Sequence, residues 1–371
     1  MASEDRATAL AAVRDRDRSR HGDEAVDPRP GGRRRAPSMA DVAKIAGVSA
    51  QTVSRVANGR ANVDLATRDK VLSAMRVVGY QPNGAARALA TGRFGAFGVI
   101  SFSISRIGDA RTIEAIANAS RTAGYSINLM VVERPTLGGV SAAIANLAGQ
   151  NVDGVVIIQA EILDVPSLVI GPTLPVVITD TYPSPHPDYP IVDTDQEGGV
   201  RRAVEHLLAM GHETVWHVAG PTTSSAAQER TEAWGQVLTR AGASVPPVHR
   251  GDWTAGSGYR IGALLAEVPR EELTAVFCAN DQMAIGLMRA FHERGVRIPQ
   301  DVSVVGFDDI DEAEFVWPPL TTVRQRFDEV GELCVQTMLE QIEQQGRGAK
   351  TLRLVPVELI VRDSSGPVPR R

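Results

Sequence analysis

The stretch Ser38–Asn58, SMADVAKIAGVSAQTVSRVAN, has the pattern of two short helices joined by a tight turn. Ser38 is a candidate N-cap for the first helix, supported by Asp41 three residues later. Gly47 provides the turn, because glycine reaches positive φ without a steric penalty. The first helix is expected to bury an apolar face made of Val42, Ala43, Ile45 and Ala46.

The second helix is expected to start at Ser49, which can cap it, and to turn Val53 and Val56 inward. Gln and Arg side chains form bidentate bonds to base edges, and Ser and Thr bond to bases or phosphates. The side chains left facing outward have this chemistry: Gln51, Thr52, Ser54 and Arg55. A helix-turn-helix places such a helix in the DNA major groove. The alternative is an ordinary helical hairpin with a solvated face.

A third amphipathic helix is expected over Val63–Val78, ending at Gly79. Its inward side chains are predicted to be Val71, Leu72, Met75 and Val78. Motifs of this region follow in a specific order: Asp41-Val42-Ala43, Ala46-Gly47-Val48-Ser49, Thr52-Val53-Ser54-Arg55-Val56, Tyr80-Gln81-Pro82-Asn83 and Ala86-Arg87-Ala88-Leu89. With this spacing the chain resembles the LacI/GalR family of transcription regulators. The resemblance continues nearly to the C-terminus and leaves out residues 1–37 and the last few.

The resemblance implies contacts with operator DNA along the N-terminal part of the chain. The residues at the matching positions are Ser38, Ser49, Ala50, Gln51, Thr52, Ser54, Arg55, Asn58, Tyr80, Asn83, Ala86 and Leu89. The segment Asn83–Ala90 is too short for a stable helix alone in water, and Gly84 weakens it further. The resemblance implies that it folds on operator DNA, pairs with its copy in a partner chain and inserts Leu89 into the minor groove. The alternative is a flexible linker without a DNA role.

Charge is distributed unevenly along the 371 residues. The net charge is −5, but the segment Ser38–Gly95 is net +5. A basic module on an acidic body fits nucleic-acid binding at one end. The cysteines Cys278 and Cys334 are expected to be buried thiols in a reducing compartment. No apolar run is long enough to span a bilayer, and the N-terminus lacks a secretory signal, so we expect no membrane association and a cytoplasmic location.

From Ala96 onward, apolar segments of strand length alternate with helical segments that end at glycine. Examples are Phe97–Ser101, Gly154–Ile158, Val176–Thr179, Ala275–Ala279 and Val302–Phe307. This pattern predicts parallel sheets covered by helices on both faces. The expected fold class is therefore α/β: a three-helix DNA-binding domain and a hinge helix, then a periplasmic-binding-protein-like domain of two doubly wound subdomains. The predicted boundaries are 1–37 for a disordered tail, 38–82 for the DNA-binding domain, 83–95 for the hinge and 96–371 for the effector domain.

Polar residues stand where several predicted strands end, which is where open α/β sheets bind ligands. Carboxylates, amides and guanidinium groups bond to the hydroxyls of a sugar, while an aromatic face covers its C–H side. The resemblance implies effector contacts at Asp180, Arg230, Trp253, Asn280, Asp308, Gln325 and Phe327. Ser103 and Gln159 follow two further strands and are expected to contribute, as are Gly108 and Thr112 at the entrance of the first helix of this domain. Each acidic residue has the alternative of a helix cap or crossover hydrogen bond, which we favour for Asp281 and Asp309.

The family crosses between its two subdomains three times, which we expect near Asp193–Gln196, Thr322–Phe327 and Leu354–Val357. The loops Gly251–Trp253 and Phe315–Thr322 resemble those of galactoside-responsive members, so a galactoside-type effector is expected. The leucine heptad that ends tetrameric members is missing after a final strand, Val355–Arg362. A homodimer is therefore expected.

The leading hypothesis is a repressor that a small sugar releases from operator DNA. The alternatives are a repressor that uses a corepressor metabolite, and a sugar-binding protein without a DNA role. An enzyme is a third class, but no nucleotide-binding glycine loop, metal-ligand spacing or nucleophile elbow is present in the sequence. We therefore expect no cofactor, no metal and no catalytic residues.

Overall fold

The computed structural model describes residues 37–57, 62–80, 92–132, 136–159, 174–180, 189–346, 348 and 351–368. The chain divides into two compact units, Met1–Asn83 and Gly84–Arg371. The predictions for the tail before Pro37, for Asn58 and for the hinge residues Asn83, Ala86 and Leu89 lie outside the described residues.

The described part of the first unit forms three helices, α1 (Met39–Ala46), α2 (Ala50–Ala57) and α3 (Leu65–Val78). Ser38 and Asp41 form the predicted capping box, in which each side chain bonds the other residue's backbone N–H. Gly47 ends α1 with φ of 67°, and the Ser49 hydroxyl accepts a hydrogen bond from the Thr52 amide at 3.1 Å. The helix-turn-helix predicted from Ser38–Asn58 is confirmed.

The core of this unit corrects the prediction at two positions. Its buried side chains are Val42, Ala43, Val53, Val56, Val71, Ala74 and Met75. Ile45 is 55% exposed and Leu72 is 43% exposed, although both were expected to face inward. The buried stripe of α3 runs through residues 71, 74 and 75, so Leu72 lies about 100° away from Val71 around the helix axis. Similarly, α1 is only eight residues long, and Val42 and Ala43 form its buried stripe.

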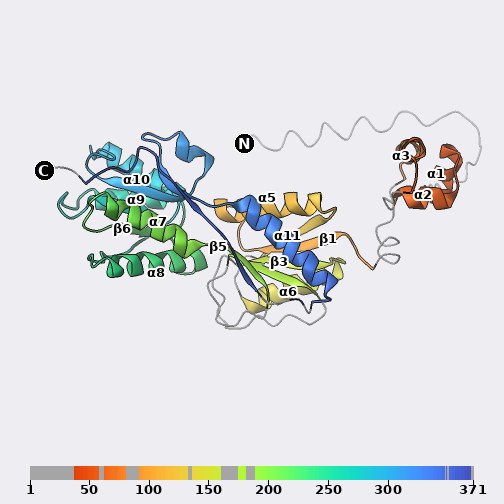
Figure 1. The fold of residues 1–371 in the computed structure, drawn as a ribbon, viewed down its shortest axis with the longest axis horizontal. Coiled ribbons are helices and arrows are strands. Elements are labelled where there is room, and N and C mark those ends of the chain that lie inside the picture. The colour runs from red at the N-terminus through yellow and green to blue at the C-terminus, as the bar shows by residue number, and fades with distance from the viewer. Residues whose placement is uncertain are drawn as a thin grey trace, which may run out of the picture. The chain divides into compact units, whose positions relative to one another are not determined.

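The second unit begins with a subdomain built on a parallel sheet, which we call the N-subdomain (Figure 1). Its strand order is β11-β5-β4-β3-β1-β2, and neighbouring strands among the described residues are parallel. The strands are β1 (Ala96–Ser101), β2 (Ser126–Val131), β3 (Gly154–Ile158), β4 (Val176–Thr179), β5 (Ile191–Thr194) and β11 (Leu352–Val355). Helices α5 (Ile107–Thr122) and α11 (Phe327–Glu343) cover one face, and α6 (Leu137–Gly149) covers the other.

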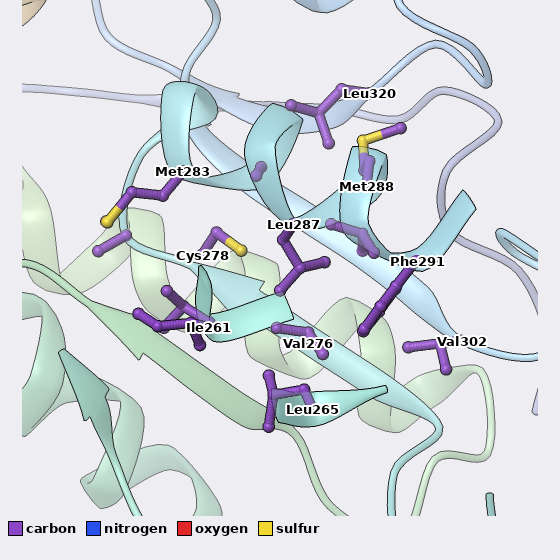
Figure 2. Close-up of a cluster of buried hydrophobic side chains, with 14 of the residues drawn as sticks. Ile261, Leu265, Val276, Cys278, Met283, Leu287, Met288, Phe291, Val302 and Leu320 are labelled. Carbon is purple, nitrogen blue, oxygen red and sulfur yellow. The ribbon is translucent and has the colours of Figure 1, made fainter. Parts of the chain in front are cut away.

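The C-subdomain repeats this plan with strand order β12-β10-β9-β8-β6-β7, of which only the β10–β12 pairing is antiparallel among the described strands. Its strands are β6 (Trp216–Ala219), β7 (His249–Arg250), β8 (Ala275–Cys278), β9 (Ser303–Asp308), β10 (Thr321–Arg324) and β12 (Glu358–Ile360). Its helices are α7 (Gln196–Ala209), α8 (Ser225–Arg240), α9 (Ala255–Leu265) and α10 (Asp281–Glu293), with a short 3-10 helix η1 (Asp311–Glu314). Helices α7 and α8 cover one face; α9 and α10 cover the other, where Leu265, Leu287 and Phe291 pack in the core shown in Figure 2.

The chain passes between the two sheets at the three predicted places. The crossings follow β5, β10 and β11, because α7, α11 and β12 each belong to the other subdomain. The predicted final strand Val355–Arg362 is wrong as a single element. Pro356 and Val357 separate β11 from β12, and the two strands join different sheets. The predicted fold class is otherwise confirmed.

Candidate functional site

The outer surface of α2 carries the side chains predicted to read DNA. Ala50, Gln51 and Arg55 are exposed, while Thr52 and Ser54 are half-buried. Gln51 and Arg55 stand four residues apart, so they lie on one face of the helix. Val53 and Val56 hold the opposite face in the core, with 0% and 6% exposure. The core contacts of α2 therefore fix the direction in which its polar face points from the three-helix unit.

Other residues of the predicted DNA set have structural bonds. The hydroxyl of Ser38 donates to Asp41 Oδ2 at 2.6 Å, and the hydroxyl of Ser49 lies 2.9 Å from the Thr52 hydroxyl. Tyr80 packs against the three-helix core, and its backbone amide donates to the Met75 carbonyl at 2.9 Å. Ser38 and Ser49 cap the starts of α1 and α2, and the Ser38 amide itself donates to Asp41 Oδ2 at 2.8 Å.

A cavity in the second unit lies at the carboxyl ends of strands from both sheets. Most predicted effector residues line it: Asp180, Arg230, Trp253, Asn280, Asp308, Gln325 and Phe327. They come from loops after β4, β7 and β8, from the end of β9, from α8 and from the crossing into α11. The two sheets thus bring together residues that lie far apart in the sequence.

Arg230 and Asp308 form the charged centre of this cavity. Arg230 Nη1 lies 3.7 Å from Asp308 Oδ1, and the side chains are 4% and 8% exposed. Gln325 Nε2 also donates to Asp308 Oδ1 at 2.7 Å, whereas Oδ2 accepts no hydrogen bond from the described residues. Burial raises the pKa of Asp308 to about 6, although Arg230 and Gln325 both act to lower that pKa. Among the described residues, Oδ2 of Asp308 therefore retains unused acceptor capacity.

The Arg230 guanidinium is held on several sides. Its Nε donates to Gln196 Oε1 at 2.8 Å, and its Nη1 donates to the carbonyl of Ala279. It also lies over the Phe307 ring, 3.7 Å from the ring centroid. These contacts fix the direction in which the remaining N–H groups point, so the side chain is preorganised.

The aromatic wall of the cavity is Trp253, which has a φ of 73°. Asn280 Nδ2 donates to the Trp253 carbonyl at 3.0 Å, while Asn280 Oδ1 accepts from the Met283 amide at 3.0 Å. The indole lies on Gly220, where an added Cβ would come within 2.4 Å of the ring. Asn280 thus caps α10 and holds the strained Trp253 backbone, and it keeps one N–H and one lone pair for a ligand.

The N-subdomain side of the cavity agrees with the prediction only in part, because Gly108 and Thr112 line it as expected. Ser103 and Gln159 are not among the residues that line it. The Ser103 hydroxyl accepts a hydrogen bond from the Ser105 amide at 3.2 Å, and the Gln159 carbonyl accepts from the Ser225 hydroxyl at 3.1 Å. The wall is formed largely by the start of α5 and the end of β5: Arg106, Ile107, Gly108, Asp109, Thr112, Asp193 and Thr194.

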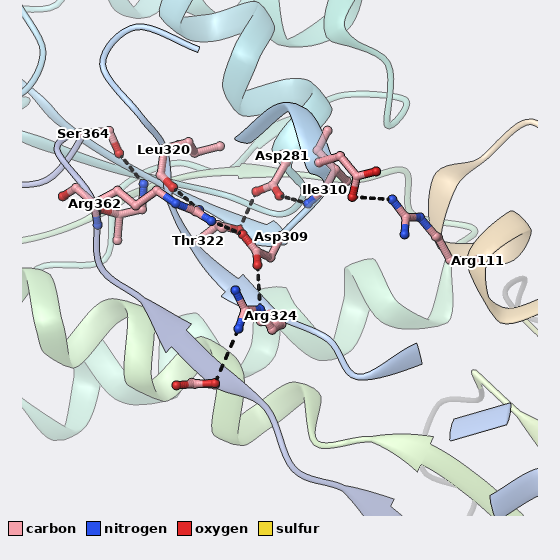
Figure 3. Close-up of polar contacts among 12 residues, drawn as sticks. Arg111, Asp281, Asp309, Ile310, Leu320, Thr322, Arg324, Arg362 and Ser364 are labelled. Atoms are coloured by element: carbon pink, nitrogen blue, oxygen red, sulfur yellow. Dashed lines mark hydrogen bonds and ion pairs between the residues drawn. The ribbon is translucent and has the colours of Figure 1, made fainter. Parts of the chain in front are cut away.

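Asp281 and Asp309 have structural contacts, as the sequence analysis favoured (Figure 3). Asp281 is fully buried and accepts hydrogen bonds from the Ile310 amide and the Thr322 hydroxyl. Burial raises the pKa of Asp281 well above its ordinary value. Asp309 accepts from Arg324 at 2.7 Å and from Arg362 at 2.8 Å.

Comparison with known proteins places this architecture in a family. The description "Bacterial regulatory proteins, lacI family" matches residues 38–83, and "Periplasmic binding protein-like domain" matches residues 204–365. The chain is 35% identical to the lactose operon repressor of Escherichia coli K12 over 342 residues, which cover 88% of this chain and 90% of that protein. The chain belongs to the lacI family. It is a DNA-binding transcriptional repressor of that family.

Other similar proteins are also repressors, under different names. The HTH-type transcriptional repressor PurR of Haemophilus influenzae PittEE is 32% identical, covering 88% of this chain and 98% of that protein. The ribose operon repressor of E. coli K12 is 31% identical, covering 86% and 97%. A crystal structure of the lac repressor dimer bound to operator and the anti-inducer ONPF superposes with a TM-score of 0.75 and 32% identity, covering 90% of this chain and 100% of that chain.

The described residues contain no helix with the length and apolar character of a membrane span. They also contain no group of three or more His, Cys, Asp or Glu residues placed to hold a metal ion. Both cysteines are buried, and burial raises the pKa of the Cys334 thiol to about 12.

Proposed function

We propose that this lacI-family repressor binds its operator as a homodimer and is released by a small neutral sugar, with a galactoside as the first candidate. Residues 38–82 would form the DNA-binding domain, residues 83–95 the hinge, and residues 96–371 the effector domain. The observation that carries the effector proposal is the ring of fixed polar groups around Asp308, closed on one side by the Trp253 indole.

The chemistry of this ring suits a polyol. Asp308 Oδ2 and the second lone pair of Asn280 Oδ1 accept hydrogen bonds, and the remaining N–H groups of Arg230 donate them. A sugar hydroxyl both donates and accepts, so it can bond to a carboxylate and a guanidinium together. Trp253 offers an apolar face for the C–H side of the sugar ring. Carboxylates outnumber guanidinium groups along the cavity wall, which disfavours an anionic effector.

The galactoside assignment is supported by the likeness to the lactose operon repressor. A structure of the regulator CelR with cellobiose also superposes, with a TM-score of 0.65, 29% identity and coverage of 88% of this chain and 99% of that chain. PurR and the ribose operon repressor are about as similar to this chain, so a galactoside is the first candidate to test among several.

The test is operator release by a panel of sugars, using the purified full-length chain and the palindromic DNA upstream of its own gene. We expect methyl β-D-galactoside or lactose to weaken operator binding, and cellobiose, ribose and glucose serve as comparisons. Tightened binding would make the ligand a corepressor. No change with any sugar, while operator binding persists, would refute a sugar effector.

The DNA-reading role of α2 is tested separately with Arg55→Ala. If Arg55 reads a base, the substitution weakens specific operator binding by about 1–3 kcal/mol and relaxes sequence preference at one position. The matched control is Arg76→Ala on α3, another exposed arginine of the same unit. An unchanged sequence preference in Arg55→Ala would reject base reading by this side chain.

A further inference from the structure

Two consecutive aspartates at the end of β9 occupy a backbone conformation that is unusual for residues with a side chain. Asp308 has a φ of 116° and Asp309 a φ of 54°, so both lie in the left-handed range. Such strain persists only where the surroundings hold it, and it concentrates at ligand sites and switch regions. The role of this turn is therefore inferred from the contacts of the Asp308 and Asp309 side chains.

Asp308 faces the effector cavity, as described above, with Arg230 and Gln325 on its Oδ1. Gln325 is also the first residue of the crossing that leads from β10 into α11. Asp308 therefore touches both the proposed ligand site and one of the connections between the subdomains.

Asp309 holds two arginines, one on each of its carboxylate oxygens (Figure 3). Arg324 is the last residue of β10, directly before the crossing at Gln325. Arg362 follows β12, and its other contacts lie near the start of β10: its Nη1 donates to the Leu320 carbonyl at 2.8 Å, and its amide donates to the Thr321 hydroxyl at 2.9 Å. Asp309 thus ties together the two strands that join the crossings.

The two crossings lie side by side at this point. Strands β10 and β12 are antiparallel, and Arg324 pairs with Glu358, the first residue of β12. The crossing after β10 therefore leaves the C-subdomain next to the point where the crossing after β11 enters it. Arg324 Nη1 lies 3.9 Å from the Glu358 carboxylate, which adds a weak contact across the same pair.

The turn is anchored on a third side by Asp281 at the start of α10. Its carboxylate accepts from the amide of Ile310, the residue after the turn, and from the Thr322 hydroxyl of β10. Asp281 is 0% exposed, so this anchor lies in the interior of the C-subdomain. With one side fixed, a change at Asp308 is expected to move Asp309 and the arginines it holds.

We infer that Asp309 is a positioning residue that couples occupancy of the effector cavity to the geometry of two crossings between the subdomains. The inference rests on the proposed function, because it takes the cavity around Asp308 to be the effector site. Asp309 itself makes no contact with the ligand: Asp308 contacts the ligand, and the shared turn transmits the change. The alternative is that Asp309 only stabilises the C-subdomain sheet.

Two variants of the full-length chain separate these readings. Asp309→Asn removes the charge shared by both arginines. Arg324→Gln is milder, because Arg324 is 45% exposed and leaves Asp309 paired with Arg362. Arg297→Gln is the control, since it breaks another arginine–aspartate pair of the C-subdomain, with Asp301, that touches no crossing. Operator affinity is measured with and without methyl β-D-galactoside, and binding of this sugar is measured by calorimetry.

Coupling between two sites of one protein commonly changes affinity about 5- to 150-fold. We expect Asp309→Asn and Arg324→Gln to bind the sugar within about threefold of the wild type, but to lose most of the change in operator affinity that the sugar causes. Arg297→Gln should retain the full response. A loss of thermal stability with the full response retained would overturn the inference and leave a structural role.

Failure of the inference and failure of the proposed function give different results. If the wild type responds to the sugar and both variants respond equally, only the coupling role of Asp309 is refuted. If the wild type shows no response and no sugar binding, the proposed function is refuted, and the inference falls with it.

Discussion

The two walls of the effector cavity are built in different ways. On the C-subdomain side, Arg230, Trp253, Asn280 and Asp308 hold one another or the neighbouring backbone through hydrogen bonds and ring contacts. On the N-subdomain side, the wall is largely the first two turns of one helix, α5, with the ends of β4 and β5. The first wall is preorganised by several elements, whereas the second can change with the residues of one helix end. We expect the C-subdomain wall to determine the affinity for the part of the ligand that related effectors share. The N-subdomain wall is expected to adjust the affinity for the part that differs between effectors.

The largest expected effect that would test this contrast is that of Asp308→Asn. It replaces a charged acceptor of the cavity by a neutral amide, and a hydrogen bond to a charged group contributes about 1.5–3 kcal/mol. Effector affinity measured by calorimetry should fall by that amount, while operator affinity without effector stays unchanged. A normal effector response would show that the C-subdomain wall does not dominate.

A smaller effect is expected from Gly220→Ala. The new Cβ would meet the Trp253 indole at 2.4 Å, so the ring must shift toward the cavity. Overpacking of this kind typically costs about 1–3 kcal/mol, and we expect that loss in effector affinity, together with an altered tryptophan fluorescence change on binding. Gly235→Ala on α8 is the matched control, because nothing lies within 4 Å of its added Cβ.

Effector binding should also depend on pH through Asp308. Burial raises the pKa of this carboxyl to about 6, so the group is ionised above pH 6 and protonated below it. Since the ionised form accepts hydrogen bonds from the ligand, affinity should be highest at pH 8 and fall about tenfold by pH 5. Burial also raises the pKa of Glu229, beside Arg230, to about 7. Any change in affinity with pH that comes from Glu229 should persist in Asp308→Asn, which distinguishes it from the change caused by Asp308. A flat profile in the wild type would contradict the assignment of Asp308.

The smallest effect is expected at the two predicted residues that do not line the cavity. Ser103→Ala and Gln159→Ala should change effector affinity by less than about 0.5 kcal/mol. Thr112→Val, at a position on α5 that lines the cavity, provides the comparison on the same side. A loss in Gln159→Ala as large as that in Asp308→Asn would mean that both walls contribute equally.

The sequence predicts one wall better than the other for a physical reason. Trp253, Asn280 and Asp308 follow apolar strands, and the carboxyl ends of parallel strands are ligand sites in open sheets. Arg106 and Asp109 instead precede or begin a helix, where polar residues are common as caps, so nothing in the local pattern separates a ligand contact from a helix end. Ser103 follows a strand, yet its hydroxyl is used in the turn before α5.

The same limit applies to parts of the fold. Strands β3 and β4 match the predicted bounds, because their residues form continuous apolar runs that are buried in the sheet. Helix α9 is difficult to predict, since it contains Gly256, Gly258 and Gly262, which favour a loop by propensity. In the structure Gly258 and Gly262 lie where α9 packs against α10. A Cβ on Gly258 would lie 2.1 Å from the Met283 carbonyl oxygen, so glycine allows the two helices to pack closely.

The exchange of elements between the two sheets has a consequence for biosynthesis. The N-subdomain core contains Val330, Cys334 and Met338 of α11 and Val355 of β11, which the ribosome makes only after the whole of β6–β10. The apolar faces of β3 and β4 therefore stay uncovered until α11 has been synthesised. As a result, the N-subdomain cannot fold completely before the C-subdomain is made. Contacts of such long sequence separation also slow folding. We therefore expect nascent chains to require protection from aggregation until the residues of β12 have emerged, at which point both sheets close together.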